Sequence, residues 1–553
     1  MNKYISLVFL CLFFIPKFSY SMPQIQTNPL EVRLKSSSAS KITCFDQTVC
    51  GSSLVKEFYV TNKFSPIWIK NGQPNLNATK FISALRLSYT EGLNPQSYHL
   101  DQINAMLSEI EKKHSKNEAV GIDKLVSFEL TLTDAFFLYA SDLAYGKINV
   151  KAAHPSWTVT KRPFDLKALL VTSLHSGNFV NSLASLDPKY QGYSDLKDAL
   201  DFYQKIDEDG GWDKIPDGDV LKLKSSGYRV KLLQNRLAIT GELGDIPDSE
   251  FGQFNEQLKD AVIAFQLDHG LESSGTVNKA TLAALNVPVN KVIRQIELNM
   301  DRMRVLPNNM GDKYIYINIP HYYLTVFENG ESKLGMPVVV GKGGKQSCVV
   351  TSKISYFEIN PYWYVPDSIA KELLLEVKQD PLILEDNKIK VFKSLSDSKS
   401  EIDPKTIDWA DVETSNFKYK FRQEPGPDNA LGTMKFVFPN NCGIYLHYTL
   451  SPELFDGSRR DLSHGCIRIA DPIALALNLL NNKDGWDQKK IESIIDTAKM
   501  KTVQLPNPIN IYIVYFTNWV DESGVLQFRN DIYRLDNSNF PVALKPSSTT
   551  KVQ

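Results

Sequence analysis

Residues 443–447 read Gly-Ile-Tyr-Leu-His, and residues 463–469 read Ser-His-Gly-Cys-Ile-Arg-Ile. The apolar residues of the first segment alternate with Tyr445 and His447, which predicts a strand with these two side chains on one face. The second segment has a glycine directly before Cys466, where a tight turn lets a substrate approach the backbone closely. Together the two segments predict a β-rich domain in which a strand with an imidazole lies near a turn with a thiol.

A cysteine and a histidine in such an arrangement are typical of nucleophilic catalysis. A thiol needs a neighbouring base or positive charge to become a thiolate, and His447 is the candidate base for Cys466. Arg468 is two residues after Cys466, so in an extended chain it projects to the same side and can hold a substrate carboxylate through two hydrogen bonds. We therefore interpret Cys466 as the nucleophile, His447 as its base and Arg468 as a substrate-binding residue.

Neighbouring groups can stabilise the negative oxygen that forms when a thiolate attacks a carbonyl. The backbone N–H groups around Gly465 and Cys466 can form an oxyanion hole, and the hydroxyl of Tyr445 can add a further donor. His464 can support the same site or orient the turn. The expected site therefore combines a nucleophile, a base and several hydrogen-bond donors.

Three other interpretations compete with this one. Cys466 could be a buried structural cysteine with an incidental histidine near it. A zinc site could use the two histidines and Cys466, with Cys442 as a fourth ligand, but the spacing fits no common structural zinc pattern. A papain-like protease would have the cysteine before the histidine, and here the order is reversed. We therefore expect neither a metal nor a cofactor.

The chain around these segments has the period of short strands. Alternating runs bounded by turn residues predict strands at 314–319, 323–327, 336–340, 355–360, 434–438, 443–447, 510–517 and 526–534. A polar stretch at 367–425, which contains a helical run at 369–377, interrupts this pattern. We call it the insertion and expect it to act as a lid that excludes water from the site. Residues 312–537 are thus expected to form the catalytic domain, and residues 538–553 a disordered tail.

Two helical regions precede the strands. Residues 45–205 have mostly helical periodicity and no cluster of reactive side chains, which indicates a structural scaffold. Residues 206–218 are rich in turn residues and predict a linker. Residues 219–288 show three short apolar helical faces, and we call this segment the bundle. The expected fold class is therefore multidomain α+β.

The N-terminus has the features of an export signal. An apolar run at 5–15 follows Lys3, and it is too short to cross a membrane, which takes about 20 residues. It is typical of a signal peptide, here residues 1–21 with cleavage after Ser21, and a retained inner-membrane anchor is the alternative. No later apolar run approaches the length of a membrane span, so we expect no span in the mature chain and a periplasmic location.

The cysteines support an exported protein with one free thiol. Six are present, and removal of residues 1–21 leaves an odd number, which indicates an unpaired cysteine. Cys44 and Cys50 could close a small loop, and Cys348 and Cys442 could pair. The connectivity cannot be read from the sequence.

Composition excludes one class of function. The chain has 553 residues and a formal net charge of −1, whereas proteins that bind nucleic acid through phosphates carry a clustered excess of positive charge. Charged residues make up 23% and hydrophobic residues 42%, close to the average of soluble globular domains. We therefore expect no nucleic-acid partner.

The bundle resembles the three-helix peptidoglycan-binding domain of bacterial cell-wall enzymes. Besides the apolar positions of its helices, the Phe265-Gln266 pair, the Gly270-Leu271 pair and the Gly275 turn carry the likeness. The resemblance implies that this segment binds the cell wall.

The stretch from His447 to Cys466 is similar to the signature of the YkuD-type L,D-transpeptidases, which has a histidine, a gap of similar length and then Ser/Thr-His-Gly-Cys. The family usually places asparagine two residues after the cysteine. Arg468 stands there in this chain, as in the large Gram-negative branch of the family. That branch also has a helical scaffold domain, a peptidoglycan-binding module and a substrate-capping insertion, so the resemblance covers about residues 45–537.

The resemblance implies cysteine acyl transfer on peptidoglycan stem peptides. Cys466 would attack the carbonyl of the third residue of a tetrapeptide stem, and a second stem would resolve the thioester to form a 3→3 cross-link. Hydrolysis by an L,D-carboxypeptidase or peptide-releasing enzyme of the same fold is one alternative. A non-catalytic wall-binding protein is the other. Carbapenems resemble acyl donors for this family and are expected to inhibit covalently.

The resemblance also assigns supporting residues. The backbone carbonyl of Tyr448 would orient His447, while Tyr445, His464 and Gly465 would stabilise the oxyanion or hold the turn. Trp363 lies in an Asn-Pro-Tyr-Trp segment that resembles the family's pocket wall, so it would contact the stem; a core aromatic is its other interpretation.

Overall fold

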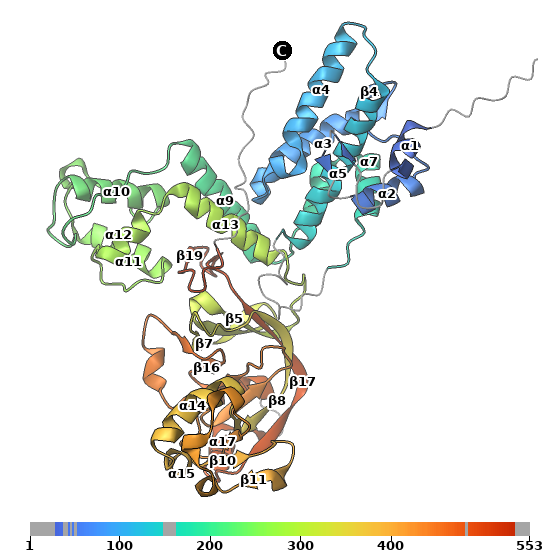
Figure 1. Cartoon of the computed structure of the whole chain (residues 1–553). Coiled ribbons are helices and arrows are strands. Elements are labelled where there is room, and N and C mark those ends of the chain that lie inside the picture. The colour runs from blue at the N-terminus through green and yellow to red at the C-terminus, as the bar shows by residue number, and fades with distance from the viewer. Residues whose placement is uncertain are drawn as a thin grey trace, which may run out of the picture. The chain divides into compact units, whose positions relative to one another are not determined.

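The computed structural model describes residues 28–36, 43–44, 47–48, 52–147, 162–481 and 485–536 (Figure 1). The expected signal peptide, the expected tail and Cys50 lie outside these residues. The chain divides into two compact units, Met1–Ala78 with Gln102–Phe137 and Thr79–Asp101 with Leu138–Gln553. Among the described residues, no helix is both long and apolar enough to cross a bilayer.

The first unit is mainly helical. Its helices, some of which continue into the second unit, are α1 (Pro29–Ser36), α2 (Ser52–Thr61), α3 (Leu76–Arg86), α4 (Leu100–Ser115) and α5 (Ile122–Tyr145). Phe128 and Leu132 of α5 are fully buried, as their helical spacing predicts. Glu129 is buried beside them, where its carboxylate accepts hydrogen bonds from the Tyr59 hydroxyl and the Trp68 N–H. Burial raises the pKa of Glu129 to about 7.

The second unit has four further helices before and after the bundle, two of which pack against the C-terminal sheet. They are α7 (Leu166–Ser176), α8 (Phe179–Ala184), α9 (Gln191–Glu208) and, after the bundle, α13 (Val289–Met303). Helices α9 and α13 lie side by side. Apolar residues of both helices, such as Leu200 and Ile296, belong to the same buried cluster as Ile315 and Ile511 of the sheet. This shared core places the two helices against the sheet.

The bundle has a core of its own. Its helices are α10 (Tyr228–Thr240), α11 (Glu256–Asp268) and α12 (Lys279–Leu285), and its buried residues form a cluster separate from that of the sheet. Gln266 is fully buried and bonds to the N–H of Gly275 and to the Thr281 hydroxyl. Gly275 has a φ of +68°, and a Cβ there would lie 2.8 Å from the Lys259 side chain, so the turn requires glycine.

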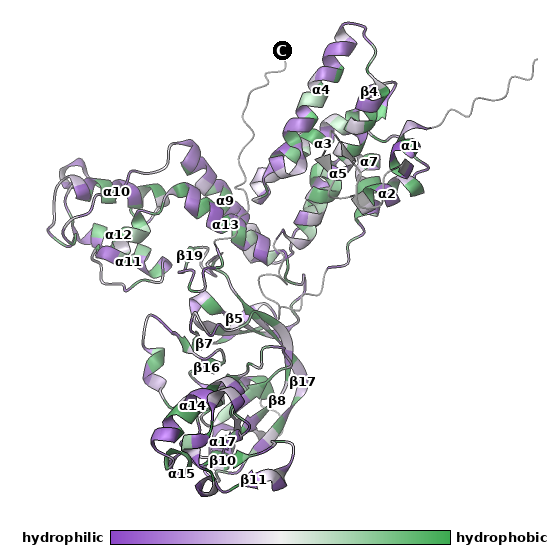
Figure 2. Ribbon diagram, viewed as in Figure 1, coloured by the Kyte–Doolittle hydropathy of each residue, from purple (hydrophilic) through white to green (hydrophobic). Residues whose placement is uncertain are grey.

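The C-terminal region is built on a nine-stranded sheet. Its order is β15-β7-β16-β14-β13-β8-β17-β5-β6, with a further pairing between β6 and β7 that closes the sheet on itself. The strands are β5 (Lys313–Asn318), β6 (Tyr323–Glu328), β7 (Glu331–Gly341), β8 (Val350–Ile359), β13 (Met434–Val437), β14 (Leu446–His447), β15 (Asp461–Ser463), β16 (Ile467–Ile469) and β17 (Lys501–Val514). Hydrophobic residues concentrate along β5 and β8 (Figure 2).

These strands differ in length from the expected ones. The strand expected at 443–447 is reduced to its last two residues, because Asn440 bonds to the backbone of Ile444 and holds the preceding residues in a turn. The strand expected at 526–534 ends at Phe528 as β19 (Leu526–Phe528), which pairs with β18 (Asn518–Val520). Helices α16 (Pro472–Leu480) and α17 (Gln488–Ile495) follow β16, and the side chain of Asp471 caps α16 by accepting a hydrogen bond from the Ala474 N–H.

The insertion folds as a small α/β unit. It contains α14 (Asp367–Gln379), α15 (Ile383–Asp386), β10 (Ile389–Phe392), β11 (Glu401–Ile402) and β12 (Lys420–Gln423). These strands form a four-stranded sheet with β9 (Trp363–Tyr364), around a separate buried cluster that includes Leu374 and Phe421. The sequence indicated the helix but not this sheet, because strands of two to four residues are too short to show a period.

Cys348 and Cys442 form a disulfide with an S–S distance of 2.02 Å. The bridge joins the residues just before β8 to the turn before β14. Cys466 is the free cysteine among the described residues.

Candidate active site

A row of polar side chains crosses one face of the sheet. In the register of β13, β14 and β16, Lys435 lies beside His447, and His447 lies beside Arg468. The alternate residues of these strands, including Leu446 and Ile467, are fully buried on the opposite face. The row therefore faces away from the core, as the alternation of the short strands requires.

Cys466 lies at the start of β16, at the end of a tightly bonded turn. The Ser463 hydroxyl donates to the Cys466 carbonyl at 2.6 Å and accepts from the Gly465 N–H at 3.1 Å. Gly465 has a φ of +118°, a backbone conformation that residues other than glycine rarely adopt. Ser347 donates a hydrogen bond to the Gly465 carbonyl at 2.7 Å from the loop next to the disulfide. The turn that presents the thiol is thus held from two sides.

The thiol is protonated at rest. Burial raises the pKa of Cys466, while hydrogen bonds from the backbone and hydroxyl of Tyr445 and the positive charges of Lys435 and Arg468 favour the thiolate without offsetting burial. These surroundings favour the protonated thiol, so a nucleophilic role for Cys466 would need a base that removes the proton.

His447 is a neutral base in this environment. It is 5% exposed, and burial together with the charge of Arg468 lowers its pKa to about 3, against the opposing effect of the carbonyls of Tyr448 and Leu431. Its Nδ1 is buried without a hydrogen bond of normal geometry. The ring therefore has an unprotonated nitrogen at neutral pH and can accept the thiol proton.

Tyr445 connects several parts of the site. Its ring centroid lies 5.8 Å from that of His447, and Lys435 Nζ lies over its face at 4.6 Å from the centroid. Burial and the Cys466 side chain raise the pKa of its hydroxyl, and a hydrogen bond from Trp363 opposes the rise. The hydroxyl thus remains a protonated donor next to the thiol, and Trp363 lies at the edge of the site as well as against the insertion core.

Arg468 has no carboxylate partner among the described residues. Its Nε is buried without a hydrogen bond, and burial lowers the pKa of the guanidinium. A cation that is partly removed from water and lacks a counter-ion is costly. The side chain is therefore available to bind an anionic group of a ligand.

His464 faces the insertion instead of the row. Its Nε2 lies 3.2 Å from Oε2 of Glu372 on α14, and the other oxygen of Glu372 lies 3.3 Å from Lys345 Nζ. Lys345 belongs to the loop that precedes the disulfide. Glu372 thus joins the insertion to both the catalytic turn and the neighbouring loop.

Sequence reasoning missed three of these residues: Glu358, Glu372 and Lys435. Lys435 Nζ lies 3.6 Å from Glu358 on β8, and both are mostly buried. The alternation of Met-Lys-Phe-Val at 434–437 placed Lys435 off the core face, but nothing in the sequence indicated that β13 would lie next to β14 on this side. Within the described residues, no three His, Cys, Asp or Glu side chains are grouped to hold a metal ion.

Comparison with known protein families agrees with this arrangement. Residues 312–499 match the model of the L,D-transpeptidase catalytic domain, YkuD. Residues 53–200 match a scaffold domain, and residues 226–285 match a domain described as "Putative peptidoglycan binding domain". The three matches follow the chain in the order of the scaffold, the bundle and the closed sheet.

Individual relatives are more distant. A "Putative L,D-transpeptidase" of Haemophilus influenzae is 30% identical over 254 residues, which is 45% of this chain and half of the relative's length. An L,D-transpeptidase structure from Stackebrandtia nassauensis is 15% identical with a TM-score of 0.21, covering 55% of this chain and 97% of that one. An L,D-transpeptidase solved in complex with imipenem is 14% identical with a TM-score of 0.17, covering 37% and 59%.

At these TM-scores the solved structures add nothing to the assignment, which rests on the family models. The predicted resemblance and the multidomain α+β class are confirmed, and the match of residues 312–499 to a catalytic domain supports the predicted enzyme. Residues 312–499 are thus similar to the YkuD family of L,D-transpeptidase catalytic domains, in a chain that also has segments similar to a scaffold domain and to a peptidoglycan-binding domain.

Proposed function

We propose that this chain forms 3→3 cross-links in peptidoglycan from tetrapeptide stems, with Cys466 as nucleophile and His447 as base. The observation that carries the proposal is the parallel pairing of β14 with β16. This register gives Tyr445, His447, Cys466 and Arg468 a common face. It supports a site in which a protonated thiol, a neutral imidazole and an unpaired cation act on one substrate.

In the first half of the reaction, the Cys466 sulfur bonds to the carbonyl carbon of the third stem residue while His447 accepts the thiol proton. The carbonyl oxygen becomes negative, and the Tyr445 hydroxyl and the N–H groups of the 465–466 turn stabilise it. The intermediate then collapses: the bond to the terminal D-Ala nitrogen breaks, and His447 gives its proton to that amine. Free D-Ala leaves and a thioester remains on Cys466.

In the second half, the side-chain amine of a diaminopimelate residue on another stem attacks the thioester carbon. His447 accepts a proton from the attacking nitrogen and returns one to the departing sulfur. An amide bond joins the third residues of the two stems, and the Cys466 thiol is restored. Each proton removed is thus returned, and the released D-Ala is the only other product.

The charge of Arg468 and the access left by the pocket wall and the insertion would determine which substrates reach Cys466. We assign Arg468 to a stem carboxylate, because the guanidinium has no carboxylate partner among the described residues. We assign Trp363 to the wall of the stem pocket, and the insertion to a lid that excludes water while the thioester exists. Tyr448 would orient His447 through its backbone carbonyl, and His464 would hold the turn through Glu372.

The setting proposed for this reaction is the periplasm. Residues 1–21 would direct export, residues 219–288 would bind the wall, residues 45–205 would form the scaffold and residues 312–537 the catalytic domain. Carbapenems would acylate Cys466, because they resemble the acyl donors of the family that this chain resembles.

The test is mass analysis of the products formed from purified disaccharide-tetrapeptides. The proposal expects a dimer that is one alanine residue lighter than a simple condensation product of two monomers, together with free D-Ala. Cys466→Ala is the control and should give no product. Tripeptide monomers without dimers, even at high acceptor concentration, would show that water is the acceptor and would refute the second half of the mechanism.

A further inference from the structure

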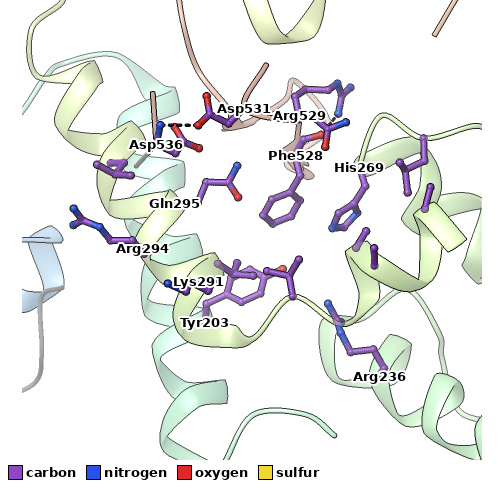
Figure 3. A pocket seen from close by; sticks show the side chains of 18 residues that line it. Tyr203, Arg236, His269, Lys291, Arg294, Gln295, Phe528, Arg529, Asp531 and Asp536 are labelled. Atoms are coloured by element: carbon purple, nitrogen blue, oxygen red, sulfur yellow. Dashed lines mark hydrogen bonds between the residues drawn. The ribbon is translucent and has the colours of Figure 1, made fainter. Parts of the chain in front are cut away.

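The bundle is joined to the C-terminal segment by a specific set of contacts. His269, at the end of α11, is stacked between Phe265, 3.8 Å away, and Phe528 of β19, 4.6 Å away (Figure 3). Arg529 donates to the carbonyl of Asp268 at 3.0 Å. A Cβ on Gly270 would lie 2.6 Å from the Arg529 side chain, so this approach needs glycine. The bundle and the catalytic region thus share a built interface.

Two cavities flank Arg529 at this interface. The first, of about 570 Å³, is drawn in Figure 3, where Lys291, Gln295 and Phe528 line it. The second, of about 730 Å³, is lined by bundle residues and by Arg459 and Arg460, which directly precede β15. The cavities share four lining residues, Leu271, Ala280, Arg529 and Asn530. We call the two together the seam cleft, and each is within the size range of ligand sites.

In the part of the chain that the structure describes, three cations of the seam cleft have no ion-pair partner. Lys291, Arg460 and Arg529 form no ion pair with a carboxylate among the described residues. Burial lowers the pKa of Arg529 to about 10 and also lowers that of Arg460, so both are charged at neutral pH. The hydrogen bonds of these two guanidinium groups go mainly to backbone carbonyls, and Arg460 Nε is buried with no partner. Partly buried cations of this kind favour an anionic ligand.

The described acidic residues near the cleft form no ion pair with these three cations, although the charges of Asp268 and Asp521 act on Arg529 from a longer distance. Asp531 accepts hydrogen bonds from the Tyr515 hydroxyl at 2.6 Å and from two backbone N–H groups. Asp536 pairs with Arg302 at 2.8 Å. Glu272 is exposed and forms no ion pair within the described residues. Neutral polar groups, among them the exposed Asn530 and Ser458, complete the lining.

We propose that the seam cleft binds a peptidoglycan strand through the carboxylates of its stem peptides, so that the wall-binding site is shared between the bundle and the catalytic region. This proposal rests on the proposed function. Arg460 is six residues before Cys466, at most roughly 20 Å of extended chain, while an extended tetrapeptide spans roughly 14 Å. A strand held in the cleft can therefore present a nearby stem to Cys466.

The test compares variants of the full-length chain in co-sedimentation with insoluble peptidoglycan. Ala280→Trp fills the junction of the two cavities, and the exposed neighbour Lys279→Trp, which lines neither, is its control. Arg460→Gln removes one unpaired charge while keeping a donor. We expect each of Ala280→Trp and Arg460→Gln to weaken binding at least about tenfold. For Arg460→Gln this is the usual effect of losing a charge-assisted hydrogen bond. The wild type should bind peptidoglycan with amidated carboxylates as weakly as these variants bind unmodified peptidoglycan.

Turnover of free tetrapeptide, which carries no glycan, separates this proposal from the catalytic one. It should be unchanged in Ala280→Trp and Arg460→Gln. If binding falls as expected while even the wild type forms no cross-link, the cleft is supported and the transpeptidase proposal fails. Unchanged binding in Ala280→Trp, equal loss in Lys279→Trp, or wild-type binding to amidated peptidoglycan would overturn the cleft. If the wild type bound anionic lipid vesicles as well as it binds peptidoglycan, and the same variants lost that binding, the seam cleft would be a general polyanion site.

Discussion

Replacing Lys435 with Met should raise the pKa of the Cys466 thiol and slow its reaction at neutral pH. Lys435 Nζ lies 4.6 Å from the centroid of the Tyr445 ring, and its charge favours the thiolate. Because both groups lie near Tyr445, the magnitude is worked for a separation of roughly 7 Å. At an effective dielectric constant between about 20 and 80, a unit charge there is worth roughly 0.6–2.4 kcal/mol, or about 0.4–1.7 pKa units.

Glu358 acts in the opposite direction. It lies 3.6 Å from Lys435 in a mostly buried position, and its negative charge disfavours the thiolate in the wild type and in the Met variant alike. The double variant Lys435→Met with Glu358→Gln removes both charges. It should lie between the wild type and the single variant, because loss of the carboxylate offsets part of the effect of losing the lysine.

The assay is the rate of Cys466 alkylation by a small uncharged electrophile as a function of pH. Loss of Lys435 should move the inflection to higher pH by about 0.4–1.7 units, and Lys435→Arg should keep it near the wild-type position. Thermal unfolding of each variant shows whether the fold is intact. An unchanged inflection in a folded Lys435→Met protein would refute the electrostatic role, and an equal shift in Lys435→Arg would point to a steric one.

The remaining predictions concern the nucleophile, the base, the substrate cation and the lid. Cys466→Ala should abolish both cross-linking and hydrolysis. His447→Ala should lower the acylation rate by about 10²–10⁴-fold, and high pH should restore part of it because thiolate then forms without a base. No recovery at high pH would argue against general-base activation. Arg468→Ala should raise the KM for tetrapeptide, while the rate of Cys466 alkylation by a small electrophile stays within a few-fold of the wild-type rate. An equal loss in both assays would show that Arg468 does not bind a substrate carboxylate. Glu372→Gln should speed hydrogen exchange in the insertion, because it removes the contacts of Glu372 with His464 and Lys345. Glu376→Gln on the same helix, which has no ion pair within the described residues, should leave the exchange unchanged. Equal exchange in both variants would show that the contacts of Glu372 do not hold the insertion.

Much of the architecture was predictable because it depends on local patterns. The burial of α5 follows from its helical spacing of large apolar residues, and the N-cap of α16 follows from its Asp-Pro start. Periods of this kind are properties of a few consecutive residues and need no knowledge of distant contacts. The sheet of the insertion was missed for the same reason, since its strands are shorter than one readable period.

The sequence alone determined which residues could react and which family the chain resembles, because the spacing of His447 and Cys466 and the glycine before the thiol are read along one short stretch of the chain. Tertiary structure alone decided what surrounds them. The register of β13 places Lys435 beside His447, the insertion places Glu372 on His464, and β19 places Arg529 against the bundle. These neighbours come from segments distant in the chain, so the charge around the thiol depends on strand order and domain contact, which no local pattern encodes.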